Sequence, residues 1–253
     1  MAKIYTITSG KGGTGKTSTA VNLGAVLNKF KEEVIIVDTN LTTPNVGLHF
    51  GTPIVPVSLN HVLQGKSNIS EAIYEHESGT KIVPSSISLK DMDKIKFKDL
   101  KNTAKKLRKF SNHIILDSAS GLGEEAKEAI KAADEIIIVI NPNILSVTDA
   151  LKTIKLSEQY NKRIRGIIIN RFKNHKTEMS LKSIKEMLEV PILGVVPEDK
   201  AIPESLVKKD AVIHTKPNSK AAKAYRDIAA KLLGKEKIPE SVLDRILSSL
   251  GLR

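Results

Sequence analysis

Short, almost entirely apolar runs alternate along the chain with longer segments of helical periodicity. The apolar runs, rich in isoleucine and valine, cover residues 3–9, 33–38, 113–118, 135–140, 166–170 and 192–197. Runs of this kind are typical of strands buried on both faces of a parallel sheet. Amphipathic segments lie between them, at residues 16–30, 99–110, 123–132, 146–160, 177–189 and 218–234. The alternation predicts an α/β fold, a doubly wound and mostly parallel sheet flanked by helices, with ligands at the carboxyl ends of the strands.

The 253 residues are enough for one sizeable domain, which we expect to span residues 1–234. A linker follows at residues 235–239, and a short separate segment, residues 240–253, closes the chain. No apolar run reaches the roughly 18 residues that cross a bilayer, and the first residues lack the apolar stretch of a signal peptide. We therefore expect a cytoplasmic protein.

One glycine-rich segment matches the pattern G-x-x-x-x-G-K-[ST], directly after the first apolar run and directly before a predicted helix. It consists of Gly10, Lys11, Gly12, Gly13, Thr14, Gly15, Lys16 and Thr17. The glycines allow backbone N–H groups to surround a phosphate, and the following helix adds the positive end of its dipole. Lys16 should reach the β- and γ-phosphates, and the Thr17 hydroxyl should bind Mg²⁺. The sequence therefore predicts a P-loop that holds a nucleotide with magnesium.

Two acidic residues stand at the ends of apolar runs. Asp38 and Asp117 each end a predicted strand, so both carboxylates should face the P-loop, where Asp117 can hold Mg²⁺ through water. A single acidic residue often ends a strand without any further role. Two of them beside one P-loop favour a metal site.

The glycine-rich segment, with a lysine at its second position, resembles the deviant Walker A motif of the MinD/ParA family of ATPases. The similarity runs from residue 2 to about residue 234 and includes VDTNLTTPNVGL, ILDSASGLG, NPNILSVTDALKT, GIIINRF and GVVPED. The first of these segments resembles switch I, and the second resembles Walker B with switch II. The resemblance implies an ATP-dependent, face-to-face homodimer in which Lys11 reaches the nucleotide of the partner subunit.

The resemblance also assigns roles to individual residues. The implied catalytic residues are Lys11, Lys16, Asp38 and Asn40, and the implied metal site is Thr17, Asp38 and Asp117. Ser18 joins the P-loop residues around the nucleotide, and the implied contacts to the adenine base are Asn170, Arg171, Pro197 and Glu198. The amide of Asn170 suits this role because it can both donate to and accept from a base edge. For Arg171, a plain turn at the end of a strand is an equally open interpretation.

Switch I departs from the family pattern at one position. The family has Asp-x-Asp, with its second carboxylate near the attacking water, whereas this chain has Asp38-Thr39-Asn40. Asparagine can orient a water molecule but cannot take its proton. Since phosphoryl transfer depends mainly on positioning and electrostatics, we expect hydrolysis to survive with slow turnover.

The absence of cysteine separates the rival branches of this family. It excludes disulfides, thiolate metal sites and iron-sulfur clusters, on which the iron-sulfur carriers and the tail-anchored-protein targeting ATPases rely. ParA proteins usually carry a D-P-Q-G-N-like run after the switch I aspartate. This chain has LTTPNVGL instead, which is more similar to MinD, and especially to archaeal-type MinD sequences.

The closing segment, residues 240–253, has amphipathic periodicity and matches the position of the membrane-targeting helix of MinD. Its apolar face comprises Val242, Leu243, Ile246, Leu247 and Leu250. One such helix binds lipid weakly, but an ATP-dependent dimer would present two of them together. We expect reversible attachment to the inner face of the cell membrane; packing against the body of the protein or a partner is the alternative.

The formal net charge of +12 suits a polyanionic partner, although a lysine-rich genome produces the same bias. Basic residues concentrate in residues 94–110, where a solvated lysine face is the default interpretation and a DNA- or lipid-binding patch the sharper one. The expected function is that of a MinD-like ATPase that positions another system, such as the division site, under a protein regulator. The alternatives are a ParA-like DNA-associated ATPase and an ATP-locked scaffold with negligible hydrolysis.

Overall fold

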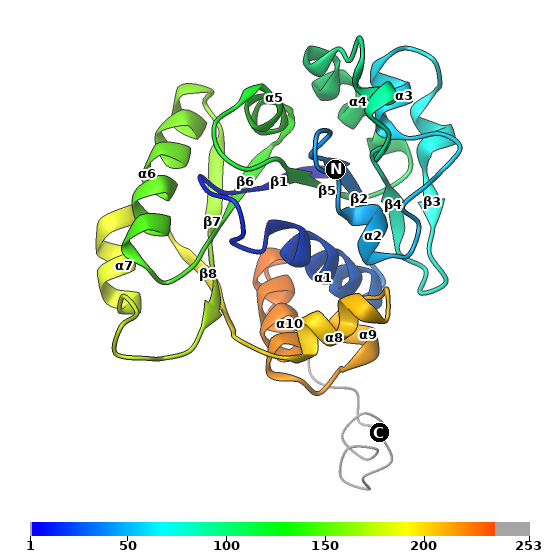
Figure 1. Ribbon diagram of the computed structural model, residues 1–253. Helices are drawn as coiled ribbons and strands as arrows, with labels where there is room; N and C mark the ends of the chain where they lie inside the picture. Colours follow the sequence, from blue (N-terminus) through cyan, green and yellow to red (C-terminus); the bar gives the residue numbers. More distant parts are fainter. Residues whose placement is uncertain (1, 236–253) are drawn as a thin grey trace, which may run out of the picture.

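The computed structural model describes residues 2–235, which form one eight-stranded sheet between two layers of helices (Figure 1). The strands are β1 (Lys3–Thr8), β2 (Val34–Thr39), β3 (Tyr74–Glu75), β4 (Lys81–Val83), β5 (His113–Ser118), β6 (Glu135–Ile140), β7 (Arg163–Phe172) and β8 (Ile192–Pro197). Their order in the sheet is β3-β4-β2-β5-β1-β6-β7-β8. Only the short pair β3 and β4 is antiparallel among these strands. The prediction of a doubly wound, mostly parallel α/β sheet is confirmed.

The helices cover both faces of this sheet because successive strand residues point to opposite sides. The α-helices are α1 (Lys16–Lys29), α2 (Val46–His49), α3 (Leu59–Leu63), α4 (Leu100–Lys106), α5 (Glu124–Ala132), α6 (Ile144–Gln159), α7 (Leu181–Leu188), α8 (Ala201–Val207), α9 (Val212–Thr215) and α10 (Lys220–Leu232). The 3-10 helices are η1 (Ile69–Ala72), η2 (Leu89–Met92), η3 (Phe97–Asp99) and η4 (Leu107–Lys109). On one face, Tyr5 and Ile7 of β1 pack in a single apolar core with α1 and α10. On the other face, Ile4 packs with α4 and α5, while α6 and α7 cover β6 and β7.

The elements that differ from the predicted pattern are short or irregular. Strands β3 and β4 span two and three residues, too few to show any periodicity in the sequence. Strand β7 begins at Arg163 and is ten residues long, which is longer than the predicted range 166–170. Polar residues at its ends hide the strand pattern in the sequence. The predicted tail at 240–253 and most of the predicted linker lie outside the described residues. Within residues 2–235, no helix is both long enough and apolar enough to cross a bilayer.

The register of the central strands brings the chemically interesting residues together. β1 lies between β5 and β6, and β5 lies between β1 and β2. Asp38 at the end of β2 is the register partner of Asp117 on β5, and Asp117 is also the partner of Ile7 on β1. The glycine-rich segment starts immediately after β1. Parallel strands thus place the P-loop and both predicted carboxylates at one edge of the sheet.

The contact between β8 and α10 provides a test of this packing. A Cβ atom added to Gly194 of β8 would lie 2.2 Å from Cγ1 of Ile228 on α10. We predict that Gly194→Ala lowers the free energy of unfolding by about 1–3 kcal/mol, since the helix must shift away from the sheet. The control is Gly12→Ala, where the added Cβ would lie 3.6 Å from Oγ of Ser120, an ordinary contact distance, and the change should be within about 0.5 kcal/mol. Chemical denaturation of both variants measures the difference, and equal stabilities would contradict this account.

Candidate functional site

The P-loop joins β1 to α1 and leaves the first turn of α1 open. Gly15, the residue before the helix, has φ of 94° and ψ of 29°, a left-handed conformation that glycine adopts without strain. No side chain caps the N-terminus of α1, so its first N–H groups are available to an anion. Gly10 is required by packing, because a Cβ atom there would lie 2.4 Å from the backbone oxygen of Asp149 in α6.

Lys16 is held in a defined position at the start of α1. Its ammonium donates a hydrogen bond to the Ser9 hydroxyl, with Nζ and Oγ 3.0 Å apart, and this hydroxyl donates to the carbonyl oxygen of Lys11 at 2.6 Å. Burial lowers the pKa of Lys16, and the nearby carboxylate of Asp117 opposes this shift. An anionic ligand next to this partly desolvated ammonium would therefore be bound strongly.

Asp117 is completely buried at the end of β5 and lacks a proper partner. No donor in residues 2–235 makes a hydrogen bond of standard geometry with either carboxylate oxygen. Burial raises the pKa of Asp117 to about 6, while the Thr17 hydroxyl and the Lys16 ammonium are close enough to oppose the rise. Two orphaned, buried oxygens beside a hydroxyl are a donor set that fits a hard divalent cation.

Asp38 is equally buried but fully engaged. Its carboxylate accepts hydrogen bonds from the backbone N–H groups of Asn40, Asn45 and Val46, at distances of 3.2, 2.8 and 2.9 Å. Burial and the neighbouring Asp117 raise its pKa well above the usual value, and the three N–H groups oppose this shift. In this conformation Asp38 shapes the loop between β2 and α2. Its predicted metal-binding and catalytic roles remain predictions.

Side-chain hydrogen bonds within the loop after β2, predicted as switch I, and to α5 hold this loop in place. The amide of Asn40 donates to the carbonyl oxygen of Thr43, whose hydroxyl donates back to Asn40 Oδ1 at 3.1 Å. Glu125 of α5 accepts from the backbone N–H of Leu41 at 3.1 Å and from the hydroxyl of Thr42. A cavity of about 360 Å³ lies between this loop and the segment after β5, with Asn40 in its wall. Asn40 therefore borders this cavity, while both polar atoms of its side chain are bonded to Thr43.

A second cavity, of about 340 Å³, lies beside the P-loop and contains the predicted base contacts. Gly15, Ser18, Asn170, Arg171, Pro197 and Glu198 all line it. Asn170 donates one N–H to the carbonyl oxygen of Thr14 at 2.8 Å, which leaves its amide oxygen and its second N–H for a ligand. Arg171 has φ of 56°, a strained conformation for this residue. The structure therefore brings together residues that are more than 150 positions apart in the chain.

Lys11 and several unpredicted residues complete the site. Lys11 is exposed at the outer side of the loop and makes no ion pair with any described carboxylate. Sequence reasoning missed Ser9, Glu125 and the apolar wall of the second cavity, which comprises Ile202, Pro203, Leu206 and Tyr225. Only Ser9 had a local signal, its place directly before the glycine-rich segment. The others reach the site through long-range packing that no local pattern reveals.

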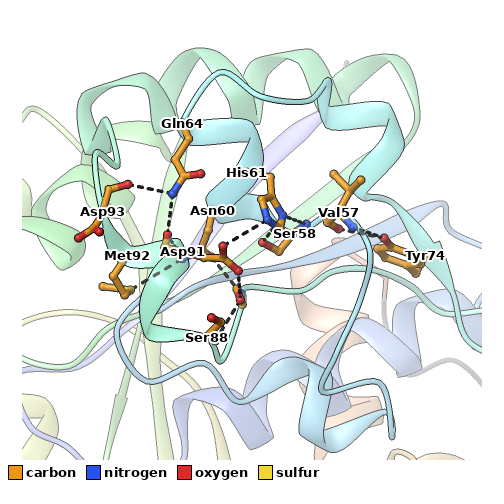
Figure 2. Close-up of polar contacts among 11 residues, drawn as sticks. Val57, Ser58, Asn60, His61, Gln64, Tyr74, Ser88, Asp91, Met92 and Asp93 are labelled. Carbon is orange, nitrogen blue, oxygen red and sulfur yellow. Dashed lines mark hydrogen bonds and ion pairs between the residues drawn. The ribbon is translucent and has the colours of Figure 1, made fainter.

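A different polar cluster contains the residue types of a nucleophilic triad (Figure 2). His61 of α3 lies 3.1 Å from the Ser58 hydroxyl through Nδ1 and 3.4 Å from Asp91 through Nε2. Ser58, however, is fully buried and caps α3, and its backbone N–H donates to the same Nδ1 at 3.0 Å. Gln64 fixes the same loop by donating to the carbonyl oxygen of Asp91. The cluster therefore holds the loop after β4 against α3 and is not a catalytic site.

Comparisons with known proteins agree with this geometry. A structure of the septum site-determining protein MinD from Pyrococcus horikoshii, described as complexed with Mg-ADP, superposes with a TM-score of 0.89. It is 31% identical, and the match covers 95% of this chain and all of that one. MinD of Bacillus subtilis is 29% identical over 96% of this chain and 93% of its own length.

Two further matches establish the family. An uncharacterized ATP-binding protein of Methanocaldococcus jannaschii is 40% identical over 234 residues, or 92% of this chain and 89% of its own. A family model described as the CobQ/CobB/MinD/ParA nucleotide binding domain matches residues 5–212. The predicted resemblance is thus confirmed, and the chain belongs to the CobQ/CobB/MinD/ParA family of nucleotide-binding domains.

Proposed function

We propose that this chain is a MinD-like ATPase that binds ATP with Mg²⁺, dimerises around the nucleotide and hydrolyses it slowly. The observation that carries the proposal is the pair of orphaned, buried oxygens of Asp117 beside Lys16 and Thr17. A buried carboxylate without partners is costly unless a cation joins it. The P. horikoshii structure, whose title names Mg-ADP, supports the choice of nucleotide and metal.

Different residues of the site have different roles in phosphoryl transfer. The open N-terminus of α1 and the Lys16 ammonium bind the phosphates, while Asp117 and Thr17 hold the metal. When bound, Mg²⁺ neutralises charge that develops on the phosphate oxygens. Lys11 is exposed at the rim of the loop, where it is free to reach a nucleotide held by a second copy of the chain. Such a lysine would stabilise the transferring phosphoryl group in the manner of an arginine finger.

Switch I sets the rate in this proposal. Asp38 holds the loop by three backbone hydrogen bonds and leaves Asn40 at the cavity wall. The amide of Asn40 can orient a water molecule but cannot accept its proton at neutral pH. Its bonds to Thr43 must also loosen before it can turn toward the phosphate. Both features favour slow turnover, and an ATP-locked scaffold is the limiting case.

We further propose reversible membrane attachment through residues 240–253 and a role in positioning another system, such as the division site. The names of the MinD relatives, which call them septum site-determining proteins, support this role. A ParA-like, DNA-associated role is the second candidate, because residues 94–109 carry exposed lysines. Among the basic side chains of that segment, only Arg108 forms an ion pair with a described carboxylate, that of Asp134.

The role of Asn40 can be measured directly. We predict that Asn40→Asp raises the steady-state ATPase rate at least about tenfold, because the new carboxylate can accept a proton from the attacking water. The control is Asn102→Asp on α4, which adds the same charge away from the site and should leave the rate unchanged. A coupled phosphate-release assay measures both variants. If Asn40→Asp and the unmodified chain turn over equally fast, switch I does not limit the rate.

The pKa of Asp117 predicts a specific pH dependence in the absence of metal. Its folded-state pKa, about 6, lies above the usual 3.8, so the protonated form contributes stability below pH 3.8 that is lost as the pH rises through 6. Asp117→Asn removes this dependence. The unmodified chain should therefore lose roughly 1–3 kcal/mol relative to the variant between pH 4 and 7, as measured by urea unfolding in EDTA. Asp227→Asn, at an exposed position, is the control. Parallel profiles for all three proteins would refute the assignment.

Membrane and DNA binding can be separated in one set of experiments. We predict that the full chain co-sediments with vesicles containing phosphatidylglycerol at least about fivefold more in Mg-ATP than in Mg-ADP, because dimerisation presents two tails. A chain that ends at residue 239 should not bind, and Leu247→Glu should behave like it. Binding to duplex DNA, titrated against salt, is measured in parallel. Salt-sensitive DNA binding without vesicle binding would favour the ParA-like alternative.

A further inference from the structure

The cavity of about 360 Å³ between switch I and the segment after β5 borders the P-loop, and it is called the switch cavity below. Its wall contains Asn40 and Thr42 from switch I, Ser120 from the segment after β5, and Glu125 from α5. A Cβ atom at Gly12 of the P-loop would lie 3.6 Å from Oγ of Ser120, so the P-loop and this wall are in contact. Since one water molecule takes up about 30 Å³ in the liquid, the switch cavity has room for several of them.

Hydrolysis of ATP needs an acceptor for one proton of the attacking water. The water oxygen forms a bond to the γ-phosphorus, the bond from this phosphorus to the bridging oxygen of ADP breaks, and one water proton leaves. Asp38 already accepts three backbone N–H groups, and the orphaned oxygens of Asp117 are assigned to the cation. The amide of Asn40 cannot accept a proton at neutral pH, and both of its polar atoms are bonded to Thr43. None of these three groups is free to take the proton in this conformation.

Glu125, in the first turn of α5, has a half-buried side chain that lines the switch cavity. Its Oε2 accepts from the backbone N–H of Leu41 at 3.1 Å, and its Oε1 accepts from the hydroxyl of Thr42. A carboxylate has about four acceptor positions, so these two bonds leave about half of them open. Glu124 lines the same wall, but its side chain is exposed. Among residues 2–235, Glu125 is therefore the carboxylate that both lines this cavity and is held there by switch I.

We propose that Glu125 is a catalytic residue of the proposed ATPase and takes the proton from the attacking water. As the water oxygen bonds to the γ-phosphorus, its proton passes to a carboxylate oxygen of Glu125, and ADP leaves with the electron pair of the broken bond. The proton later returns to solvent. The bonds to Leu41 and Thr42 keep the carboxylate beside switch I during this step. The inference rests on the proposed ATPase function and names the proton acceptor behind its slow turnover.

Glu125→Gln tests the proton transfer without removing the contacts of this side chain. A glutamine can still accept from the Leu41 N–H and donate to the Thr42 hydroxyl, so switch I keeps its anchor while the proton acceptor is lost. We predict that kcat for phosphate release in Mg-ATP falls at least about tenfold, with KM for ATP and the midpoint of urea unfolding unchanged. The control is Glu124→Gln, which removes the same charge from the same wall and should change kcat less than about twofold. Equal kcat for Glu125→Gln and the unmodified chain, or a larger loss in Glu124→Gln, would overturn the proposal.

A double variant distinguishes a proton acceptor from an anchor of the loop. Asn40→Asp adds a carboxylate to the same cavity, so it can take over the proton but cannot replace the hydrogen bond between Glu125 and Leu41. Glu125→Gln should therefore lower kcat at least about tenfold in the unmodified chain but less than about threefold in Asn40→Asp. The same loss in both backgrounds, or a weaker affinity of Glu125→Gln for a fluorescent ATP analogue, would show that Glu125 only holds the loop.

The same measurements separate this inference from the proposed function. Phosphate release that continues at full rate in Glu125→Gln would refute the role of Glu125 and leave the ATPase intact. Binding of the fluorescent analogue without phosphate release, in both the unmodified chain and Asn40→Asp, would refute the ATPase and the role of Glu125 together.

Discussion

Two buried carboxylates on neighbouring parallel strands dominate this structure. Asp38 and Asp117 are register partners at the ends of β2 and β5, and both are completely buried. Two such groups cannot both be charged without compensation, and their pKa values are raised accordingly. The two carboxylates are compensated in different ways. Asp38 accepts hydrogen bonds from three backbone N–H groups, whereas Asp117 requires a proton or a cation.

This asymmetry explains the arrangement of the loops around the nucleotide site. The N–H groups that satisfy Asp38 belong to the loop before α2, so the buried charge and the shape of switch I depend on each other. Glu125 then connects the same loop to α5, which follows the segment after β5. A ligand that binds at Asp117 acts on the strand next to Asp38. The loop after β2 and the segment after β5 are therefore connected through the sheet and through Glu125.

The sequence predicted the parts of the site that depend on local pattern. The P-loop follows from its glycines and its place between a strand and a helix, and Asp117 follows from its place at a strand end. The bond between Glu125 and Leu41 spans 84 residues and exists only because α5 packs beside β2, so no local pattern contains it. Strands β3 and β4 are set by pairing with β2 and with each other, and they are too short to have a period. The cluster around His61 has a structural role because Ser58 is buried, and the sequence alone does not show that burial.

Leu206 of α8 lies between a cavity and the outer surface. It lines the cavity beside the P-loop and is also partly exposed, next to the exposed Val207 at the end of α8. A short helix of seven residues has little rigidity of its own, so its position depends on what packs against its two sides. A ligand that filled the cavity would pack against one of these sides. If such a ligand shifted the helix, a molecule bound to the outer side would change the affinity for that ligand by the same factor, because linkage is reciprocal.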